Sequence, residues 1–230
     1  MLILAIDTAS IYCAAALIRH KSVIARINER MNKGHAEKLI GQITQIMTQA
    51  NMALDQVERI AVNIGPGSFT GVRVGVATAR ALALALEIPA VGVSALEALA
   101  AQVINSKSTA SAITVVIEAG REMFYHQNFY NDLTPLGAPG VKTIENILED
   151  LPKKTRLTGP AADAIVEHIK NHKINEKIFL EKIPCEAADI VNYAYLAANK
   201  QSKNSPCPLY LRSADAKQQT NFALPQKNNA

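Results

Sequence analysis

Two segments of the chain carry residue types that could bind an anion, namely DTAS at residues 7–10 and GPGSFTG at residues 65–71. The glycine-rich segment lies between an apolar run and a long apolar helix, and backbone amides at the start of a helix can bind phosphate. It lacks the lysine of a phosphate-binding loop and the glycine spacing of a dinucleotide fingerprint. We therefore interpret GPGSFTG first as an elbow that positions the helix. The candidates for contact with a nucleotide or another anion are Asp7, Ser10, Gly67, Ser68 and Glu118.

The turn that follows Asp7 is a weak candidate for nucleotide catalysis. A turn that holds a phosphate needs glycines so that backbone amides can approach the anion, and Ala9 and Ile11 stand here instead. The sequence therefore predicts a structural hairpin whose acid accepts hydrogen bonds from nearby amides. The corresponding turn in the second half, Glu118 to Arg121, has one glycine and one cation and is again a weak nucleotide signal.

The sequence predicts neither a catalytic residue nor a metal site. His168 and His172 lie four residues apart on a predicted helix, a spacing that can hold a metal, but no third ligand is nearby. Their polar surroundings indicate a solvated helix end. His35 stands alone near the start of another helix, and no serine or cysteine has the sequence context of a catalytic nucleophile.

The composition is that of an ordinary globular protein. The 230 residues are 49% hydrophobic and 19% charged, and the net charge of +4 is too low to indicate a dedicated nucleic-acid-binding protein. The three cysteines, Cys13, Cys185 and Cys207, are odd in number and far apart, which favours reduced thiols. The chain enters an apolar strand at once, without the pattern of a signal peptide, so we expect a cytoplasmic protein.

Hydrophobic periodicity predicts the elements that must position these residues. The first half predicts strands at 2–7, 13–18, 22–29, 60–64 and 90–93, and helices at 34–50, 70–87 and 94–105. A small polar stretch at 106–111 follows, and the pattern then restarts. The second half predicts strands at 113–118, 123–130, 133–141, 156–158 and 177–180, and helices at 143–151, 161–171 and 186–200.

Both halves therefore have the element order βββαβαβα. This order predicts an α/β fold of two tandem lobes, the architecture of the actin-like (ribonuclease-H-like, ASKHA) ATPases. We expect a first lobe at residues 1–105, a second lobe at 106–212, and a polar, partly disordered tail at 213–230. The extended segment 205–212 is expected to pack on the first lobe. Fold class alone does not fix a function.

The predicted helix 70–87 has few polar residues. Small residues recur every four positions along one side of it, at Gly71, Gly75, Ala79 and Ala83. A side with so little bulk allows another backbone to approach closely. Arg73 and Arg80 interrupt the apolar run, so we do not expect this helix to span a membrane.

Several segments occur in the order found in the TsaB (YeaZ) family: ILAIDTAS, a helix that begins near His35, IAVNIGPGSFTGVRVGVATARALA, IPAVGVSALEALA and PLYLR. The chain resembles this family strongly over residues 1–105 and more weakly beyond them. TsaB proteins are the bacterial partner subunits of TsaD, the catalytic subunit in the synthesis of threonylcarbamoyladenosine in tRNA. The resemblance implies the actin-like fold.

The resemblance also implies a subunit without catalytic activity. TsaD enzymes carry a Gly-Val-Asn-His-x-x-x-His stretch whose histidines bind the metal at the reaction centre. The similar stretch here runs from Gly92 to Leu99, and Ala95 and Leu99 occupy the places of the histidines. Neither side chain can coordinate a metal. A further departure is Glu118-Ala119-Gly120, where the family usually has Asp-Ala-Arg.

By the same resemblance, the chain is a scaffold for threonylcarbamoylation of the adenosine beside the anticodon in tRNAs that read codons starting with A. Its implied partners are a TsaD-like subunit and a TsaE-like ATPase. We expect a homodimer when it is alone, contact with tRNA only through the complex, and ATP or ADP only at the subunit interface. The expected partner-binding residues are His35, Leu39, Ile43, Ile46, Gly71, Arg73, Gly75, Val76, Ala79, Arg80 and Ala83.

A competing hypothesis is an independent enzyme, either an actin-like ATPase or kinase or a glycoprotease-like protein. Asp7, Glu118 and the GPGSFTG segment are its only support in the sequence.

Overall fold

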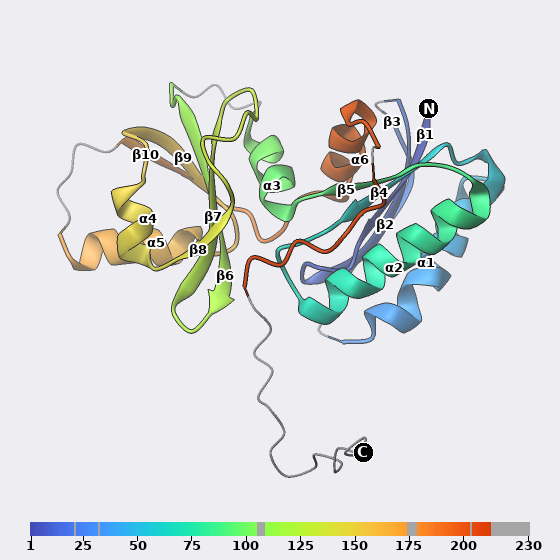
Figure 1. Cartoon of the computed structure of the whole chain (residues 1–230), viewed down its shortest axis with the longest axis horizontal. Coiled ribbons are helices and arrows are strands. Elements are labelled where there is room, and N and C mark those ends of the chain that lie inside the picture. The colour runs from blue at the N-terminus through green and yellow to red at the C-terminus, as the bar shows by residue number, and fades with distance from the viewer. Residues whose placement is uncertain (21, 32, 105–108, 174–178, 203, 213–230) are drawn as a thin grey trace, which may run out of the picture.

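The computed structural model describes residues 1–212 except 21, 32, 105–108, 174–178 and 203 (Figure 1). The polar tail expected at 213–230 lies outside the described residues. The strands are β1 (Leu2–Asp7), β2 (Tyr12–Arg19), β3 (Ser22–Arg30), β4 (Arg59–Asn63), β5 (Ala90–Val93), β6 (Ala112–Gly120), β7 (Met123–Tyr130), β8 (Gly140–Lys142), β9 (Lys154–Thr158) and β10 (Phe179–Ile183). The helices are α1 (His35–Gln49), the short 3-10 helix η1 (Leu54–Gln56), α2 (Phe69–Leu86), α3 (Ala95–Val103), α4 (Ile144–Glu149), α5 (Ala162–Asn171) and α6 (Ile190–Asn199).

The strands form two five-stranded sheets with the same topology. The first has the order β3-β2-β1-β4-β5, and the second has the order β8-β7-β6-β9-β10. In each sheet the first strand of the lobe is central, with an antiparallel hairpin partner on one side and a parallel strand on the other. This duplicated mixed sheet confirms the predicted actin-like α/β fold.

Helices cover both faces of the first sheet because the alternate residues of its central strand are all apolar. Leu2, Leu4 and Ile6 of β1 point toward the core that α1 and α2 complete, while Ile3 and Ala5 point toward α6. Figure 1 shows α1 and α2 side by side below this sheet and α6 on its other side. All of β1 is therefore buried.

The second sheet is covered by helices from two parts of the chain. Leu96, Leu99 and Val103 of α3 pack on Ile113 and Val115 of β6. Helices α4 and α5 pack on the opposite face. In Figure 1, α3 lies between the two sheets, so the two lobes share a boundary at this helix.

The sequence predicts a helix at 186–200 as part of the second lobe, but the observed helix α6 packs on the first sheet. The reason is the composition of that face, where Ala5, Ala16 and Ala61 leave a shallow apolar surface. Tyr193 and neighbouring alanines of α6 cover it. The last described segment then returns between the lobes, where the amide of Leu209 donates to the carbonyl of Ile64 (2.8 Å) and Arg212 donates to the carbonyl of Ala119 (2.7 Å).

Candidate functional site

The two candidate anion-binding segments lie against each other at the carboxyl ends of β1 and β4. The amide of Ser68 donates to the carbonyl of Ala9 (2.8 Å), and the hydroxyl of Thr8 donates to the carbonyl of Gly71 (2.6 Å). The hydroxyl of Ser68 caps α2 by accepting a hydrogen bond from the amide of Gly71 (3.2 Å). The fold thus brings Asp7, Ser10, Gly67 and Ser68 together.

Five amides of these segments, those of Ala9, Ser10, Gly65, Ser68 and Gly71, have acceptors within the chain. The Oδ1 atom of Asp7 accepts hydrogen bonds from the amides of Ala9 (2.8 Å) and Ser10 (3.3 Å) and from the side-chain amide of Asn63 (2.8 Å). Asn63 in turn accepts from the amide of Gly65 (2.8 Å). The Asp7 carboxyl therefore occupies the amides of its own turn, which are then not free to bind a phosphate. The geometry matches the structural hairpin that the sequence predicts.

Asp7 is a buried acid, and no ion pair involving it occurs among the described residues. Burial raises the pKa of this carboxyl, while hydrogen bonds from the Ser10 side chain, the Ala9 amide and Asn63 act in the opposite direction. Glu118, the other predicted acidic contact, lies on the exposed end of β6. Neither acid lines the cavity that Ser10, Gly67 and Ser68 border.

The stripe of small residues on α2 packs largely inside the chain, where Gly71, Gly75 and Ala79 are buried and Ala83 is half-buried. A Cβ atom on Gly71 would overlap the carbonyl oxygen of Thr8, and one on Gly67 would overlap that of Ala9. A Cβ on Gly75 would lie 2.7 Å from the hydroxyl oxygen of Thr8. The backbone that approaches this side of the helix is therefore the chain's own turn between β1 and β2.

Most other predicted partner-binding residues are also internal. Val76 and Ala79 of α2 are buried, as are Leu39, Ile43 and Ile46 of α1, because these side chains complete the core of the first lobe. Ala83 and His35 are half-buried, and Ala83 packs against the same core. Their apolar periodicity is the signature of a core face, and it cannot by itself distinguish that face from an interface.

Arg73 and Arg80 are the two predicted partner-binding residues that are exposed. They lie on the outer side of α2 with Ala77, Ala81 and Leu84, and the side chain of Leu84 is 82% exposed. Helix α2 is long and apolar enough to cross a membrane, with a mean hydropathy of 1.4, but its inner side packs on the first sheet. What remains is a half-exposed apolar helix, whose outer side we call the α2 outer face (residues 73, 77, 80, 81 and 84).

Phe69 and Tyr210, which are not among the predicted site residues, hold the side chain of Arg73 in place. Its guanidinium carbon lies 3.7 Å from the centre of the Phe69 ring, and its Nε donates to the hydroxyl of Tyr210 (2.8 Å). Tyr210 belongs to PLYLR, the segment quoted above for its resemblance. Its contact with residue 73 spans 137 positions, so spacing along the chain gave no signal for it.

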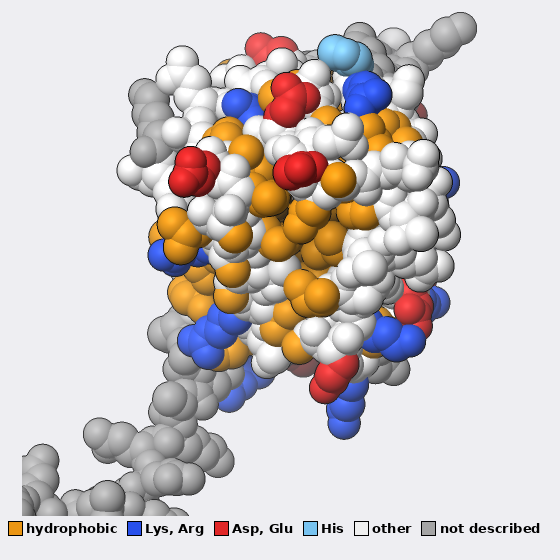
Figure 2. Space-filling view, turned by 90° about the vertical axis from the view of Figure 1, so that its right-hand side faces the viewer, with side chains coloured by type: hydrophobic (Ala, Val, Ile, Leu, Met, Phe, Trp, Pro, Cys, Tyr) orange, Lys and Arg blue, Asp and Glu red, His pale blue; other side chains and the backbone are white. Residues whose placement is uncertain are grey.

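Next to α2, the C-terminal end of α1 borders an apolar hollow. A cavity of about 480 Å³ is lined there by Ile43, Met47, Met52, Leu54 and their polar neighbours. Figure 2 shows hydrophobic side chains gathered in a hollow at this end of the molecule. Ile43, one of the predicted partner-binding residues that belong to the core, therefore also lines this surface hollow.

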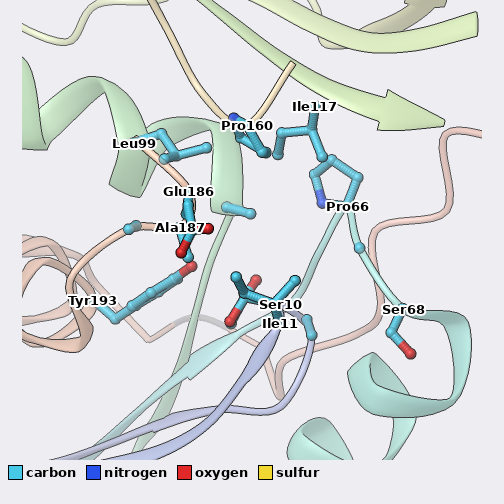
Figure 3. A pocket seen from close by; sticks show the side chains of 15 residues that line it. Ser10, Ile11, Pro66, Ser68, Leu99, Ile117, Pro160, Glu186, Ala187 and Tyr193 are labelled. Atoms are coloured by element: carbon cyan, nitrogen blue, oxygen red, sulfur yellow. The ribbon is translucent and has the colours of Figure 1, made fainter. Parts of the chain in front are cut away.

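The two lobes enclose a second, smaller cavity of about 230 Å³, which we call the inter-lobe cavity (Figure 3). Its wall includes Ala95 and Leu99, the two residues at the places where TsaD enzymes carry histidines. Both are buried, with 6% and 2% of their surface exposed. Among the residues that the structure describes, no group of three His, Cys, Asp or Glu side chains is arranged to hold a metal ion.

His168 and His172 stack on each other, with ring centres 4.1 Å apart. Glu145 of α4 approaches His168, with 3.9 Å between Oε1 and Nε2, so the structure supplies a neighbour that helix spacing did not reveal. This pair of histidines lies on α5, at the outer end of the second lobe and away from the inter-lobe cavity (Figure 1).

Comparison with known proteins gives a consistent set of relatives. A family model described as TsaD, tRNA N6-adenosine threonylcarbamoyltransferase, matches residues 23–215. The tRNA threonylcarbamoyladenosine biosynthesis protein TsaB of Buchnera aphidicola (subsp. Schizaphis graminum) is 33% identical over 69% of this chain and 78% of its own length. The TsaB protein of Bacillus subtilis is 38% identical over 54% of this chain, and the match spans about half of that relative (53%).

Solved structures with the same fold agree. YeaZ from Pseudomonas aeruginosa superimposes with a TM-score of 0.74 at 22% identity, over 91% of this chain and 99% of the other. A hexokinase of the ROK family from Thermus thermophilus gives a TM-score of 0.51 at 12% identity, over 86% and 98%. These likenesses show the fold.

Proposed function

The chain belongs to the TsaB (YeaZ) family, and from that premise we propose that it is a non-catalytic subunit in the biosynthesis of threonylcarbamoyladenosine in tRNA. The modified residue is the adenosine beside the anticodon of tRNAs that read codons starting with A. In this proposal the chain binds a TsaD-like catalytic subunit, and a TsaE-like ATPase joins the assembled pair. The tRNA is reached through the complex, and ATP or ADP binds only at the subunit interface.

The inter-lobe cavity is the observation that carries this proposal. In an actin-like enzyme the reaction centre lies between the lobes, yet here that space is bordered by the methyl group of Ala95 and the isobutyl group of Leu99. Neither offers a lone pair to a metal. The facing turns also support a non-catalytic role, because Asp7 and Asn63 accept the hydrogen bonds that a bound phosphate would need.

The α2 outer face is the surface that best suits a partner subunit. Leu84 exposes most of its side chain near the C-terminal end of α2, and Arg80 and Arg73 follow on the same side toward the N-terminal end. Ile40 on the neighbouring helix α1 is 54% exposed. Exposed apolar helix surface of this kind favours association, and when the partner is absent a second copy of this chain would cover it. This proposal replaces the buried glycine stripe with the opposite side of the same helix.

Reconstitution of the modification tests the role directly. The full chain is mixed with the TsaD-like and TsaE-like subunits of the same organism, ATP, the small substrates and unmodified tRNA. Modified nucleoside is then measured with and without this chain. We expect product only when the chain is present. Undiminished product in its absence would contradict the proposal.

The competing hypothesis of an independent ATPase, kinase or glycoprotease-like enzyme is tested with the isolated chain. Calorimetry with ATP and magnesium should show neither tight binding nor turnover, because the amides of Gly65, Ser68 and Gly71 in the elbow already donate to acceptors within the chain. Steady ATP hydrolysis by the chain alone, lost when Asp7 is replaced by asparagine, would favour the enzyme.

A further inference from the structure

The inter-lobe cavity has mostly apolar walls that come from both lobes. Ile11 lies in the turn after β1, Pro66 in the elbow before α2, and Leu99 in α3. Ile117 of β6 and Pro160 reach it from the second lobe. Figure 3 shows these side chains around a common space, which is closed on one side by the loop that carries Ala187. A small, mostly apolar space with few polar groups is the usual form of a small-molecule site.

One polar group in this cavity is free to bind a ligand. Tyr193 of α6 is only 1% exposed, and its hydroxyl points into the space (Figure 3). Among the described residues that hydroxyl has no hydrogen-bond partner, whereas the side chains of Tyr12 and Asn63 are both paired. Buried tyrosine hydroxyls normally have a partner. The unpaired hydroxyl of Tyr193 therefore indicates a group that the cavity would receive.

The charges around the cavity disfavour an anionic ligand. Among the described residues that line it there is no lysine, arginine or histidine. The carboxyl of Asp7 lies directly behind Asn63, at a hydrogen-bond distance of 2.8 Å. Glu186 stands at the rim, where it accepts from the hydroxyl of Tyr12 (3.2 Å) and lies 3.4 Å from Arg30. A phosphate here would face the carboxyls of Asp7 and Glu186 with no cation in the described wall, since Arg30 beside Glu186 is already paired with that acid.

The size of the cavity limits the ligand to one or two rings. An engineered apolar cavity of about 150 Å³ in another protein binds benzene. A volume of about 230 Å³ therefore has room for a single ring or a fused pair, and it is below the range of about 300–1,000 Å³ that is typical of larger ligands.

We propose that the inter-lobe cavity binds an uncharged compound of one or two fused rings, which forms a hydrogen bond with the hydroxyl of Tyr193. This site is independent of the partner surface on α2, and it differs from a nucleotide site in excluding phosphate. Binding would tie together the β1–β2 turn, α3, α6 and the second lobe, since all of them contribute to its wall.

Three probes of similar shape test the site on the full chain by titration followed by amide chemical shifts in NMR spectra. Indole is neutral and can donate a hydrogen bond, indene has the same two rings without the N–H group, and indole-2-carboxylate is an anion. We expect indole to bind with a dissociation constant of about 1 mM. Indene should bind about fivefold more weakly, and the carboxylate should not saturate the site. The shifted amides should include those of Leu99 and Ala187.

Matched variants separate the hydroxyl from the rest of the wall. Tyr193→Phe removes only an unpaired hydroxyl. This variant should bind indole and indene with equal affinity, and its affinity for indene should equal that of the wild type. Tyr130→Phe makes the same change at a half-exposed tyrosine outside the cavity and should leave both affinities as they are. Ala187→Phe, on the loop beside the space, should abolish binding of both rings while the thermal unfolding midpoint stays within a few degrees of the wild type.

The proposal is overturned if none of the probes gives a saturable shift with the wild-type chain. It is also overturned if indole-2-carboxylate binds as tightly as indole, or if Tyr193→Phe retains the preference for indole over indene. None of these outcomes depends on whether the chain supports tRNA modification.

Discussion

Replacement of Gly71 by alanine tests whether the small side of α2 belongs to the interior. The added methyl carbon would overlap the carbonyl oxygen of Thr8 and would lie 2.9 Å from the Thr8 carbonyl carbon and 3.2 Å from the Cβ atom of Ser68. The obstruction is backbone, which cannot rotate away as a flexible side chain can. The Thr8 hydroxyl also donates to the carbonyl of Gly71, so a shift of the helix would break that bond too (2.6 Å).

The expected loss of stability follows from two opposing effects. Alanine is favoured over glycine in a helix by about 1 kcal/mol, whereas overpacking of this kind costs about 1–3 kcal/mol or more. Because the overlap here is with backbone, we expect Gly71→Ala to lose about 2 kcal/mol net. For a chain of this size that corresponds to a fall in the unfolding midpoint of about 4–8 °C by calorimetry.

Gly41→Ala is the matched control, because it makes the same change inside a helix. Apart from the neighbouring backbone of α1 itself, no described atom lies within 4 Å of the position that a Cβ would take at Gly41. This variant should therefore gain up to about 1 kcal/mol from helix propensity alone. If Gly71→Ala were as stable as Gly41→Ala, the small side of α2 would not pack on the Thr8 turn, and our assignment of that side to the interior would be wrong.

Two further predictions concern titratable groups. Burial, and then the charge of Lys142, lower the pKa of His126 from 6.5 to about 4. The unfolded chain then takes up a proton that the folded chain refuses, so stability is complete above pH 6.5 and falls as the pH drops toward 4, by up to about 3 kcal/mol. His126→Gln should reduce the pH dependence of the free energy of unfolding, measured by urea denaturation at several pH values in this range. An unchanged pH dependence would contradict the assignment. Burial, followed by the charges of Asp7 and Glu29, raises the pKa of the Cys13 thiol to about 11, whereas Cys207 is exposed. A thiol reagent at pH 8 should therefore modify Cys207 in the folded chain and Cys13 only on unfolding; equal rates would show that Cys13 is accessible.

Much of the fold could be predicted from the sequence because its signals are local. The apolar run of β1, the amphipathic period of α1 and the Gly-Pro-Gly elbow each fix an element within a few residues. The repeated element order then predicts the duplicated sheet. The position of α6 could not be predicted this way, because its partner face of small residues comes from β1, β2 and β4, far away in the chain.

The candidate site was harder to predict for the same reason. A stripe of glycine and alanine on α2 indicates that some backbone approaches, but not which one, and the structure shows that it is the turn at Thr8. The position of the Arg73 side chain depends on its hydrogen bond to Tyr210, and the position of the Tyr193 hydroxyl depends on where α6 packs. Periodicity identifies faces of elements, whereas pairing between distant faces requires the folded chain.

The α2 outer face is the central claim about partner binding, and the mass of the assembled complex tests it most directly. The full chain is mixed with the TsaD-like subunit and examined by size-exclusion chromatography with light scattering, as wild type, as Leu84→Glu, and as Leu136→Glu. Leu136 is 39% exposed in the second lobe and serves as the matched control. We predict a stable heterodimer for the wild type and for Leu136→Glu, and separate subunits for Leu84→Glu, with all three chains folded. A heterodimer that forms equally well with Leu84→Glu would contradict the account.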